Sequence, residues 1–307
     1  MKMRVWIIAI AAVVIVVALG VHLSRMPHMA STGGVPSQSG VLHIVAAENF
    51  WGSLAAQIGG AHVQVLSIVS DPNADPHEYE TNAGDARAVA GANYVIENGA
   101  GYDSWMDKLV SAGPGSNTDR KVLNVATLIG KKEGDNPHFW YDPDYVNAAA
   151  VQMGQDLVAL DPANASYYEA QYQTLQASLA QYQNRIMTIK QQFGGTKVAA
   201  TEDIFVYLAN AAGLDLVSPP AFTAAVAEGN DPPASSIVQF EAQLKSGDVK
   251  VLVYNQQTVT PLTDSMKALA AAQGIPLVAV TETIQPPSLS FEDWMNGQLI
   301  ELQNALK

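Results

Sequence analysis

Hydrophobic residues recur with helical spacing through one long stretch, residues 161–195. The intervals between bulky apolar side chains alternate between four and three residues, which places these side chains on one face of a helix. They are Tyr168, Tyr172, Leu175, Leu179, Tyr182, Ile186, Ile189 and Phe193. Asp161 with Pro162 suits an N-cap and first turn, and Gly194 with Gly195 suits a helix end. We therefore predict one stiff helix of about 45 Å, long enough to join two lobes.

Short β-rich runs alternate with helical segments on both sides of this helix. Strands are predicted at residues 41–47, 62–69, 93–97, 122–125, 197–201, 214–217, 249–254 and 277–280. Helices are predicted between them, and the segment after residue 217 is predicted as a Pro-rich loop. This alternation is typical of parallel sheets covered by helices. The predicted fold class is α/β, with two lobes of mainly parallel sheet joined by one long rigid helix. A coiled-coil dimerisation helix is the alternative for residues 161–195, although alternating charges at e and g positions are missing.

The predicted organisation has four parts. Residues 1–40 contain Lys2 and Arg4 before an apolar run, and then a Ser/Gly/Pro-rich segment, which predicts a signal peptide or membrane anchor followed by a flexible tether. Residues 41–160 form the first lobe, residues 161–195 the connecting helix and residues 196–307 the second lobe. We therefore expect an extracytoplasmic protein, exported or anchored by its N-terminal hydrophobic helix.

The amino-acid composition excludes cysteine chemistry and argues against some classes of partner. The chain has no cysteine and a formal net charge of −13. Disulfides, thiolate metal ligands, a cysteine nucleophile and a lipid-modified cysteine are thereby excluded. The acidic balance argues against nucleic acid as a partner, and it attracts cations.

Four potential metal ligands lie at predicted strand ends or in loops next to the gap between the lobes. They are His77, His138, Glu202 and Glu282. Imidazole and carboxylate together suit a divalent first-row ion. Four protein ligands leave no position for an activated water, which favours carriage of a metal over chemistry on it. Spacing alone does not select this set, because the four residues are far apart in the sequence.

Two segments support the set by resemblance. The segment beginning DPHEYETNAGDARAVAGANYVIENGAGYDSWMDKL and the segment NPHFWYDPDYV contain His77 and His138 in Pro-His pairs. They resemble the two signatures of the zinc and manganese receptors of ABC importers, a group of solute-binding proteins, and the resemblance covers nearly all of residues 41–307. It implies that both histidines bind metal, that Glu202 in TEDIFVYLANAAGL supplies a third ligand and Glu282 a fourth. It also implies an ABC permease as partner.

The sequence does not decide between Mn²⁺ and Zn²⁺ as the bound metal. This chain has Thr281-Glu282-Thr283 where the family normally has an Asp, and residues 111–135 contain no histidine, whereas zinc-dedicated members usually carry a His-rich loop. The resemblance thereby favours Mn²⁺, while the affinity order of divalent ions favours Zn²⁺. The expected cargo is one divalent ion, Mn²⁺ or Zn²⁺, carried by a monomer.

Alternatives stay open for residues and for function. Glu202 also suits a helix N-cap, Glu48 or Asp142 could accept a hydrogen bond from a ligand histidine, and Asp142 also suits a turn. A receptor for an organic solute or metal chelate, a surface adhesin and a metallohydrolase are the competing functions. We expect no enzyme, because HExxH, G-x-S-x-G and a phosphate-binding Gly loop are missing from the sequence.

Overall fold

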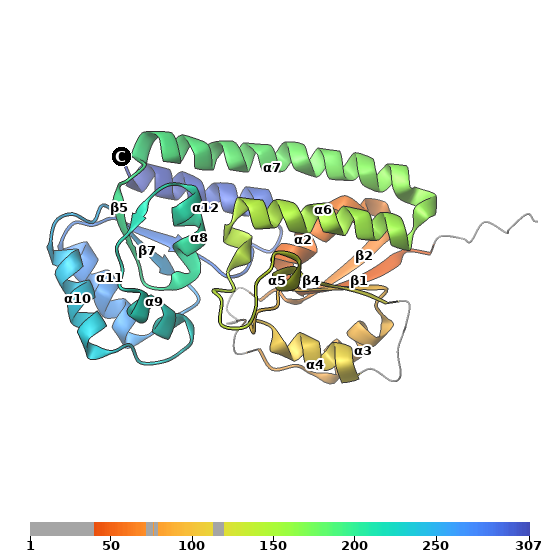
Figure 1. The fold of residues 1–307 in the computed structure, drawn as a ribbon, viewed down its shortest axis with the longest axis horizontal. Coiled ribbons are helices and arrows are strands. Elements are labelled where there is room, and N and C mark those ends of the chain that lie inside the picture. Colours follow the sequence, from red (N-terminus) through yellow and green to blue (C-terminus); the bar gives the residue numbers. More distant parts are fainter. Residues whose placement is uncertain (1–39, 72–75, 77–78, 113–119) are drawn as a thin grey trace, which may run out of the picture. The chain divides into compact units, whose positions relative to one another are not determined.

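Two parallel sheets form the framework of the protein in the computed structural model, which describes residues 40–71, 76, 79–112 and 120–307 (Figure 1). The strand order is β2-β1-β3-β4 in the first sheet and β6-β5-β7-β8 in the second. Every pairing is parallel. The α/β fold class with two parallel sheets is therefore confirmed.

The elements of the first sheet and its covering helices run from residue 42 to residue 160. They are β1 (Leu42–Glu48), α2 (Asn49–Gly59), β2 (Val63–Val69), α3 (Ala83–Gly91), β3 (Tyr94–Glu97), α4 (Ser104–Ala112), β4 (Lys121–Asn124), α5 (Val125–Leu128) and α6 (Pro143–Leu160). Alternate residues of β1 serve opposite faces, as the two-residue period of a strand requires. Ile44 and Ala46 belong to the core beneath α2 and α6, while Val45 and Ala47 pack with Val89 of α3.

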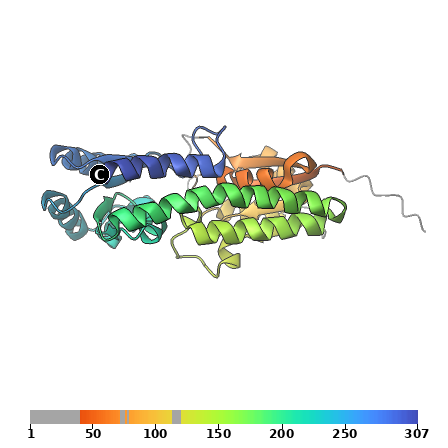
Figure 2. The same ribbon diagram turned by 90° about the horizontal axis from the view of Figure 1, so that it is seen from above.

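The long helix α7 (Ala165–Phe193) joins the two halves and runs alongside both of them (Figures 1 and 2). Six of its eight predicted apolar positions are buried, and Tyr172 and Phe193 are half-buried. This face packs against α2, α6 and a C-terminal helix. The chain's own helices thus occupy the surface that a coiled-coil partner would need.

The start of α7 differs from the prediction. A short 3-10 turn, Pro162–Asn164, precedes the helix, and the Asp161 side chain caps neither element. Its carboxylate instead accepts hydrogen bonds from Asn164 Nδ2 at 2.7 Å and from the buried Tyr168 hydroxyl at 2.9 Å. Side-chain donors three and seven residues further along the chain therefore occupy the carboxylate in place of the backbone N–H groups that a cap would accept from.

The second sheet and its helices complete the fold. They are β5 (Lys197–Ala200), α8 (Val206–Ala211), β6 (Asp215–Leu216), α9 (Pro220–Ala227), α10 (Ala234–Lys245), β7 (Leu252–Asn255), α11 (Pro261–Ala272), β8 (Leu277–Val280) and α12 (Phe291–Ala305). Helix α9 lies where a Pro-rich loop was predicted, and it buries Phe222 and Val226 against α10. That prediction was wrong because the prolines precede or open the helix, where a missing N–H costs little.

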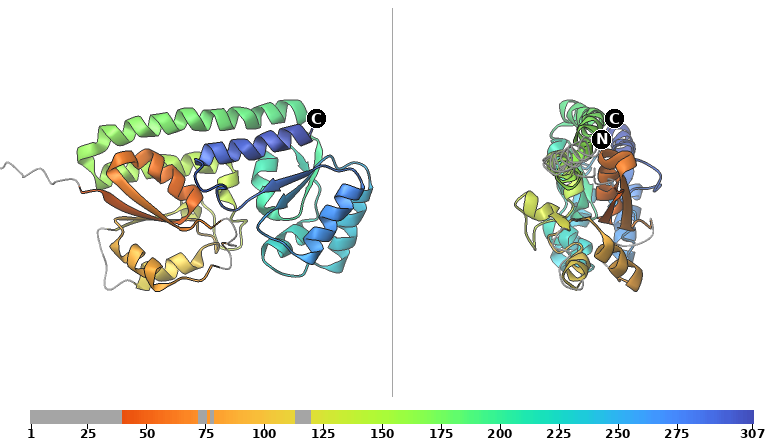
Figure 3. Two further views of the ribbon diagram at one scale, coloured as in Figure 1. Left: turned by 180° about the vertical axis from the view of Figure 1, so that it is seen from behind. Right: turned by 90° about the vertical axis from the view of Figure 1, so that its right-hand side faces the viewer.

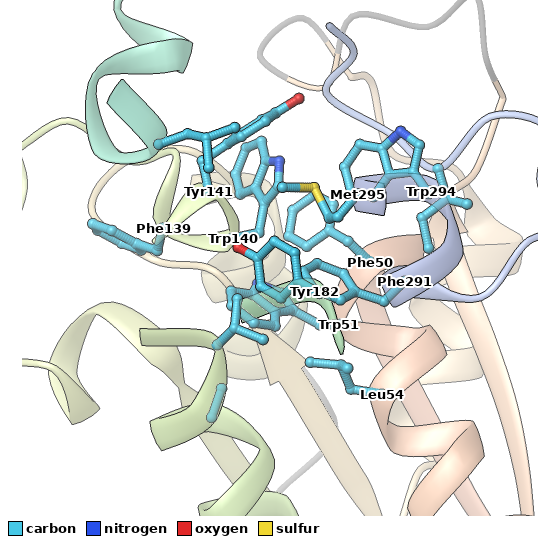
Figure 4. Close-up of a cluster of buried hydrophobic side chains, with 14 of the residues drawn as sticks. Phe50, Trp51, Leu54, Phe139, Trp140, Tyr141, Tyr182, Phe291, Trp294 and Met295 are labelled. Atoms are coloured by element: carbon cyan, nitrogen blue, oxygen red, sulfur yellow. The ribbon is translucent and has the colours of Figure 1, made fainter. Parts of the chain in front are cut away.

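The C-terminal helix α12 returns along α7 and contacts α2 as well as β8 (Figure 3). Phe291 and Met295 of α12 pack near Phe50 and Trp140 of the first half (Figure 4). One continuous hydrophobic core therefore extends from the first sheet to the second, and residues 40–307 form one unit. Within the described residues, no helix combines the length and apolar character needed to cross a bilayer. The predicted signal or anchor, residues 1–40, lies outside them except for Gly40.

Candidate metal centre

Three of the four predicted ligands come together where the two sheets meet. His138, Glu202 and Glu282 have exposed fractions of 0%, 1% and 1%. Glu202 and Glu282 each follow the last residue of a strand, β5 or β8, by two positions, so parallel pairing delivers both carboxylates to the same edge. His77 lies outside the described residues, and its role stays a prediction.

The His138 ring is oriented by Asn136. The Asn136 side-chain oxygen accepts a hydrogen bond from the His138 backbone N–H at 3.0 Å and lies 2.8 Å from ring Nδ1. An amide oxygen can only accept, so Nδ1 carries a proton and donates it. The other nitrogen, Nε2, faces Glu282 Oε1 at 3.6 Å. Asn136 therefore orients the ring so that Nε2, the nitrogen that would bind a metal, points toward Glu282.

The surrounding charges hold a proton on His138. Burial alone lowers the pKa of this histidine, but the carboxylates of Glu282 and Asp203 outweigh burial and raise the pKa to about 10. Asp203 Oδ1 lies 3.3 Å from Nδ1. Without a metal, the histidine is thus a cation paired with carboxylates at neutral pH.

Asn255, the last residue of β7, bridges the two glutamates. Its amide nitrogen donates to Glu202 Oε2 at 2.9 Å and to Glu282 Oε1 at 2.8 Å. Its amide oxygen accepts from the Gln257 backbone N–H at 3.0 Å, which fixes the orientation of the amide. Burial and the adjacent Glu282 carboxylate raise the pKa of Glu202 to about 8, against the lowering effect of Asn255.

The first half of the chain also reaches Glu282. The Tyr102 hydroxyl donates to Glu282 Oε2 at 2.6 Å, and the Tyr102 ring packs on Trp140 with centroids 5.2 Å apart. Gln257 Oε1 accepts from the backbone N–H groups of Glu282 and Thr283 at 2.7 and 3.1 Å. Glu282 is consequently held by groups from both halves of the chain.

A polar hollow of about 380 Å³ opens beside His138 and is lined by Tyr102, Asn136 and Asp203. The carboxylate residues Glu133 and Glu228 are exposed at its walls. We call this feature the acidic hollow. It gives a cation a negatively charged approach to the buried cluster.

The described donors do not by themselves form a complete metal cage. Among residues 40–71, 76, 79–112 and 120–307, no three His, Asp or Glu side chains surround one point closely enough to hold a metal ion. The Asn255 amide lies between Glu202 and Glu282 and hydrogen-bonds both. The donor types nevertheless fit a divalent first-row ion, because an imidazole and two carboxylates supply borderline and hard ligands.

Comparison with known proteins decides the family. Residues 44–305 match the sequence profile of ZnuA, described as zinc-uptake complex component A, periplasmic. The chain belongs to this family. The manganese-binding lipoprotein MntA of Halalkalibacterium halodurans is 29% identical over 185 residues, which are 57% of this chain and 59% of MntA.

Two further relatives are named for different metals. The manganese ABC transporter substrate-binding lipoprotein PsaA of Streptococcus pneumoniae is 26% identical over 198 residues, 58% of this chain and 61% of PsaA. The iron ABC transporter substrate-binding lipoprotein MtsA of Streptococcus pyogenes serotype M1 is 27% identical over 200 residues, 60% of this chain and 63% of MtsA. The chain thus spans about three fifths of the length of the curated relatives it matches.

Solved structures share the fold. A crystal structure of ZnuA superimposes with a TM-score of 0.70 at 23% identity, covering 87% of this chain and all of that one. The periplasmic zinc-binding protein TroA of Treponema pallidum gives a TM-score of 0.72 at 17% identity, covering 86% and 98%. The two-lobed arrangement with one long helix is therefore shared with this family.

For this family member, the structure also assigns the residues with open roles. Glu202 caps no helix through its side chain. Asp142 is the N-cap of α6 and accepts from the Asp144 and Tyr145 N–H groups, so it is occupied as a turn residue. Glu48 is fully buried, and neither of its oxygens has a hydrogen-bond partner among the described residues. The acceptor beside His138 Nδ1 is thus Asn136, not Glu48 or Asp142.

Three polar residues of the cluster were missed from the sequence: Tyr102, Asn136 and Asn255. Asn255 had a usable signal, because it ends a strand next to β5 and β8 in the same parallel sheet. Asn136 directly precedes the Pro-His pair, and Tyr102 lies in the GAGYD stretch after β3. The contacts of Tyr102 with Glu282 and of Asn136 with the Asp203 carbonyl join the two halves of the chain, which sequence spacing does not report.

Proposed function

We propose that the protein is an extracytoplasmic receptor that captures one divalent transition metal ion, Mn²⁺ or Zn²⁺, between its two halves. It passes the ion to the membrane permease of an ABC importer and performs no catalysis itself. The observation that carries the proposal is the buried cluster of His138, from a loop of the first half, with Glu202 and Glu282, which follow strands β5 and β8 of the second sheet. Relatives named as manganese and iron binding lipoproteins support the same cargo class.

The proposed ligands are His77, His138, Glu202 and Glu282. His138 contributes Nε2 after losing the proton that faces Glu282, and the two glutamates contribute carboxylate oxygens. A sphere filled by four protein ligands leaves no position for an activated water. Transport of the ion therefore suits the cluster better than hydrolysis does.

Release of the ion is proposed to use local loop movement. Helices α7 and α12 and the shared core link the two halves. Asn49 adds a reciprocal pair of hydrogen bonds with the Ile284 backbone, at 2.9 and 3.3 Å. A large rotation would expose this apolar interface, which costs about 25 cal/mol per Å² of apolar surface. A lobe rotation of tens of degrees between metal-loaded and metal-free crystals would contradict this proposal.

Membrane attachment is proposed to depend on residues 1–40. The relatives named above are lipoproteins, whereas this chain has no cysteine to carry a lipid. Export or anchoring must then use the apolar segment that follows Arg4. Labelling intact cells with a membrane-impermeant reagent would test the location, and protection of the folded part from the reagent would contradict it.

Metal content tests the proposed function most simply. The protein is purified without chelator, and bound metals are measured by elemental analysis. We expect close to one Mn or Zn per chain in the wild-type protein and loss of that metal in His138→Ala. His62→Ala serves as the control, because His62 packs on Tyr167 away from the cluster. Metal-free wild-type protein that also fails to bind added Mn²⁺ or Zn²⁺ would refute the proposal.

A further inference from the structure

The loop that carries His138 is joined to the second half of the chain by two hydrogen bonds of opposite direction. The Tyr207 hydroxyl, from α8, donates to the Asn136 backbone carbonyl at 2.8 Å. The Asn136 side-chain amide in turn donates to the Asp203 backbone carbonyl at 2.7 Å, while its oxygen lies 2.8 Å from His138 Nδ1. One side chain thus connects a proposed ligand of the first half to the residue after Glu202.

Aromatic contacts lie beside these hydrogen bonds. The centroid of the Tyr207 ring is 5.5 Å from that of Tyr145 and 6.1 Å from that of Phe139, both in the first half. The Lys131 ammonium lies over the two tyrosine rings, 5.6 Å from the Tyr145 centroid and 5.7 Å from the Tyr207 centroid. A cation at this distance is attracted to the face of an aromatic ring. We call Lys131, Asn136 and Tyr207 the latch.

Residues 130–137 have the features of a segment that can move. Gly130 and Gly134 have φ values of +72° and +88°, and among the described residues both lie in open surroundings. Residues 132–134 are exposed. Glycine changes its φ without a steric penalty, so these two positions suit hinges. The loop can therefore swing away from the second half when the latch opens.

The latch resists opening less than the core between the halves does. Tyr207 and Asn136 are half-buried, so water can replace their hydrogen bonds when the loop moves. Separation of the halves would instead expose the continuous apolar core, at a cost proportional to the area exposed. Opening of the latch also frees the Asn136 side chain that orients His138. Movement at the latch therefore acts directly on one proposed metal ligand.

We propose that Tyr207 is a positioning residue that fastens the His138 loop to the second half, and that opening of the latch sets the rate at which a bound ion leaves. This inference rests on the proposed receptor function and specifies the local loop movement that releases the ion. Loss of the latch does not slow association, because the ion enters through the open form of the loop.

Tyr207→Phe tests the latch with the smallest change. It removes the hydroxyl that bonds the Asn136 carbonyl and keeps the aromatic ring in place. Tyr167→Phe is the matched control, because Tyr167 is also half-buried and its hydroxyl accepts from the Ala61 backbone N–H at 3.2 Å, away from the cluster. Both variants lose one hydroxyl and no ring, so a difference between them reports on the position of the hydroxyl.

Lys131→Met tests the cation separately, because it removes the ammonium and keeps a long apolar side chain. Lys267→Met is its control, since the Lys267 ammonium lies 4.9 Å from the Tyr254 ring centroid, entirely within the second half. Both variants lose one positive charge. Measurement at high salt screens the effect of that charge on ion association.

Zn²⁺ release is measured by stopped flow, by mixing Zn²⁺-loaded protein with an excess of a chromogenic chelator. In Tyr207→Phe we expect dissociation to be about three- to tenfold faster, the effect of one neutral hydrogen bond, and association at least as fast as in wild type. In Lys131→Met we expect dissociation to be about two- to fivefold faster. Both controls should release Zn²⁺ at the wild-type rate.

Hydrogen exchange of the metal-free proteins gives a second readout, which a general loss of stability would not reproduce. The amides of residues 130–136 and 203–207 should exchange faster in Tyr207→Phe than in wild type, while those of β1 and β5 should not change. Faster exchange throughout the chain, with an unchanged rate of Zn²⁺ dissociation, would show a purely structural role for Tyr207 and overturn the inference.

The remaining outcomes separate the inference from the function it rests on. Tight Zn²⁺ binding by wild-type protein, with equal dissociation rates in wild type and Tyr207→Phe, overturns the role of the latch and leaves the receptor function intact. Equal acceleration in Tyr207→Phe and Tyr167→Phe also overturns it. No binding of Zn²⁺ or Mn²⁺ by the wild-type protein overturns the receptor function and the inference together.

Discussion

Metal capture is expected to release protons, and the structure sets their number. In the metal-free protein the pKa of His138 is raised to about 10 and that of Glu202 to about 8. Both groups therefore carry a proton at pH 7, His138 as imidazolium and Glu202 as the neutral acid. A metal ion binds the deprotonated forms, so it must displace both protons.

The size of the effect follows from this count. Each displaced proton raises the apparent affinity about tenfold per pH unit while the pH stays below the group's pKa. Between about pH 6 and pH 7, two protons predict a rise of up to about a hundredfold. Glu202→Gln removes one titrating group, and the predicted rise falls to about tenfold.

Isothermal titration calorimetry in two buffers of different ionisation enthalpy measures the released protons directly. Zn²⁺ titrated into wild-type protein at pH 7 should release about two protons, and about one in Glu202→Gln. An affinity that does not change with pH, together with equal proton release in both proteins, would refute the assignment of His138 and Glu202 as proton-bearing ligands.

Three further predictions concern stability and kinetics. Because its folded pKa of about 8 exceeds the ordinary 4.5, the stability that Glu202 contributes is present at low pH and is lost as the pH rises. In urea unfolding, the free energy of unfolding of metal-free Glu202→Gln, relative to that of wild type, should therefore rise by at most about 1.4 kcal/mol per pH unit between about pH 5 and pH 8. A difference between the two proteins that does not change with pH would contradict this. Leu179→Ala, in the buried face of α7, should lower the free energy of unfolding by about 2–5 kcal/mol. Met187→Ala, on the exposed face of the same helix, should lower it by less than about 0.5 kcal/mol. Equal costs would contradict the burial. Glu133→Gln with Glu228→Gln should slow Zn²⁺ association in stopped flow at low salt only, because screening removes steering; equal slowing at high salt would exclude the acidic hollow as the approach.

The regular elements were largely predictable because their signals are local. The four-and-three spacing in α7 reflects one buried helix face, and the β-rich runs reflect strands covered on both sides. Helix α12 had local signals too, since Ser290 caps it and Glu292 and Asp293 lie in its first turn, but it was not predicted. Helix α12 packs against α2, α7 and β8 at the same time. Its apolar residues are therefore spread around the helix and do not form one regular stripe.

The candidate site was predictable only in part. Strand-end position and resemblance pointed to His138, Glu202 and Glu282, and the structure buries all three in one cluster. The contact of the Tyr102 hydroxyl with Glu282 could not be predicted, because it joins residues 180 positions apart in different halves of the chain. The contact of Asn255 with Glu282 lies within the second sheet, where strand order alone brings the two residues together. Asp161 was predicted as a cap, but its carboxylate accepts from the Tyr168 hydroxyl, seven residues further along the chain.

Anomalous diffraction from crystals of the protein soaked in Zn²⁺, recorded at the zinc absorption edge, tests the proposed metal site most directly. The account predicts one peak between the two halves, about 2.0–2.2 Å from His138 Nε2 and from an oxygen each of Glu202 and Glu282. A peak bound elsewhere in the molecule, with these three side chains unchanged, would contradict it.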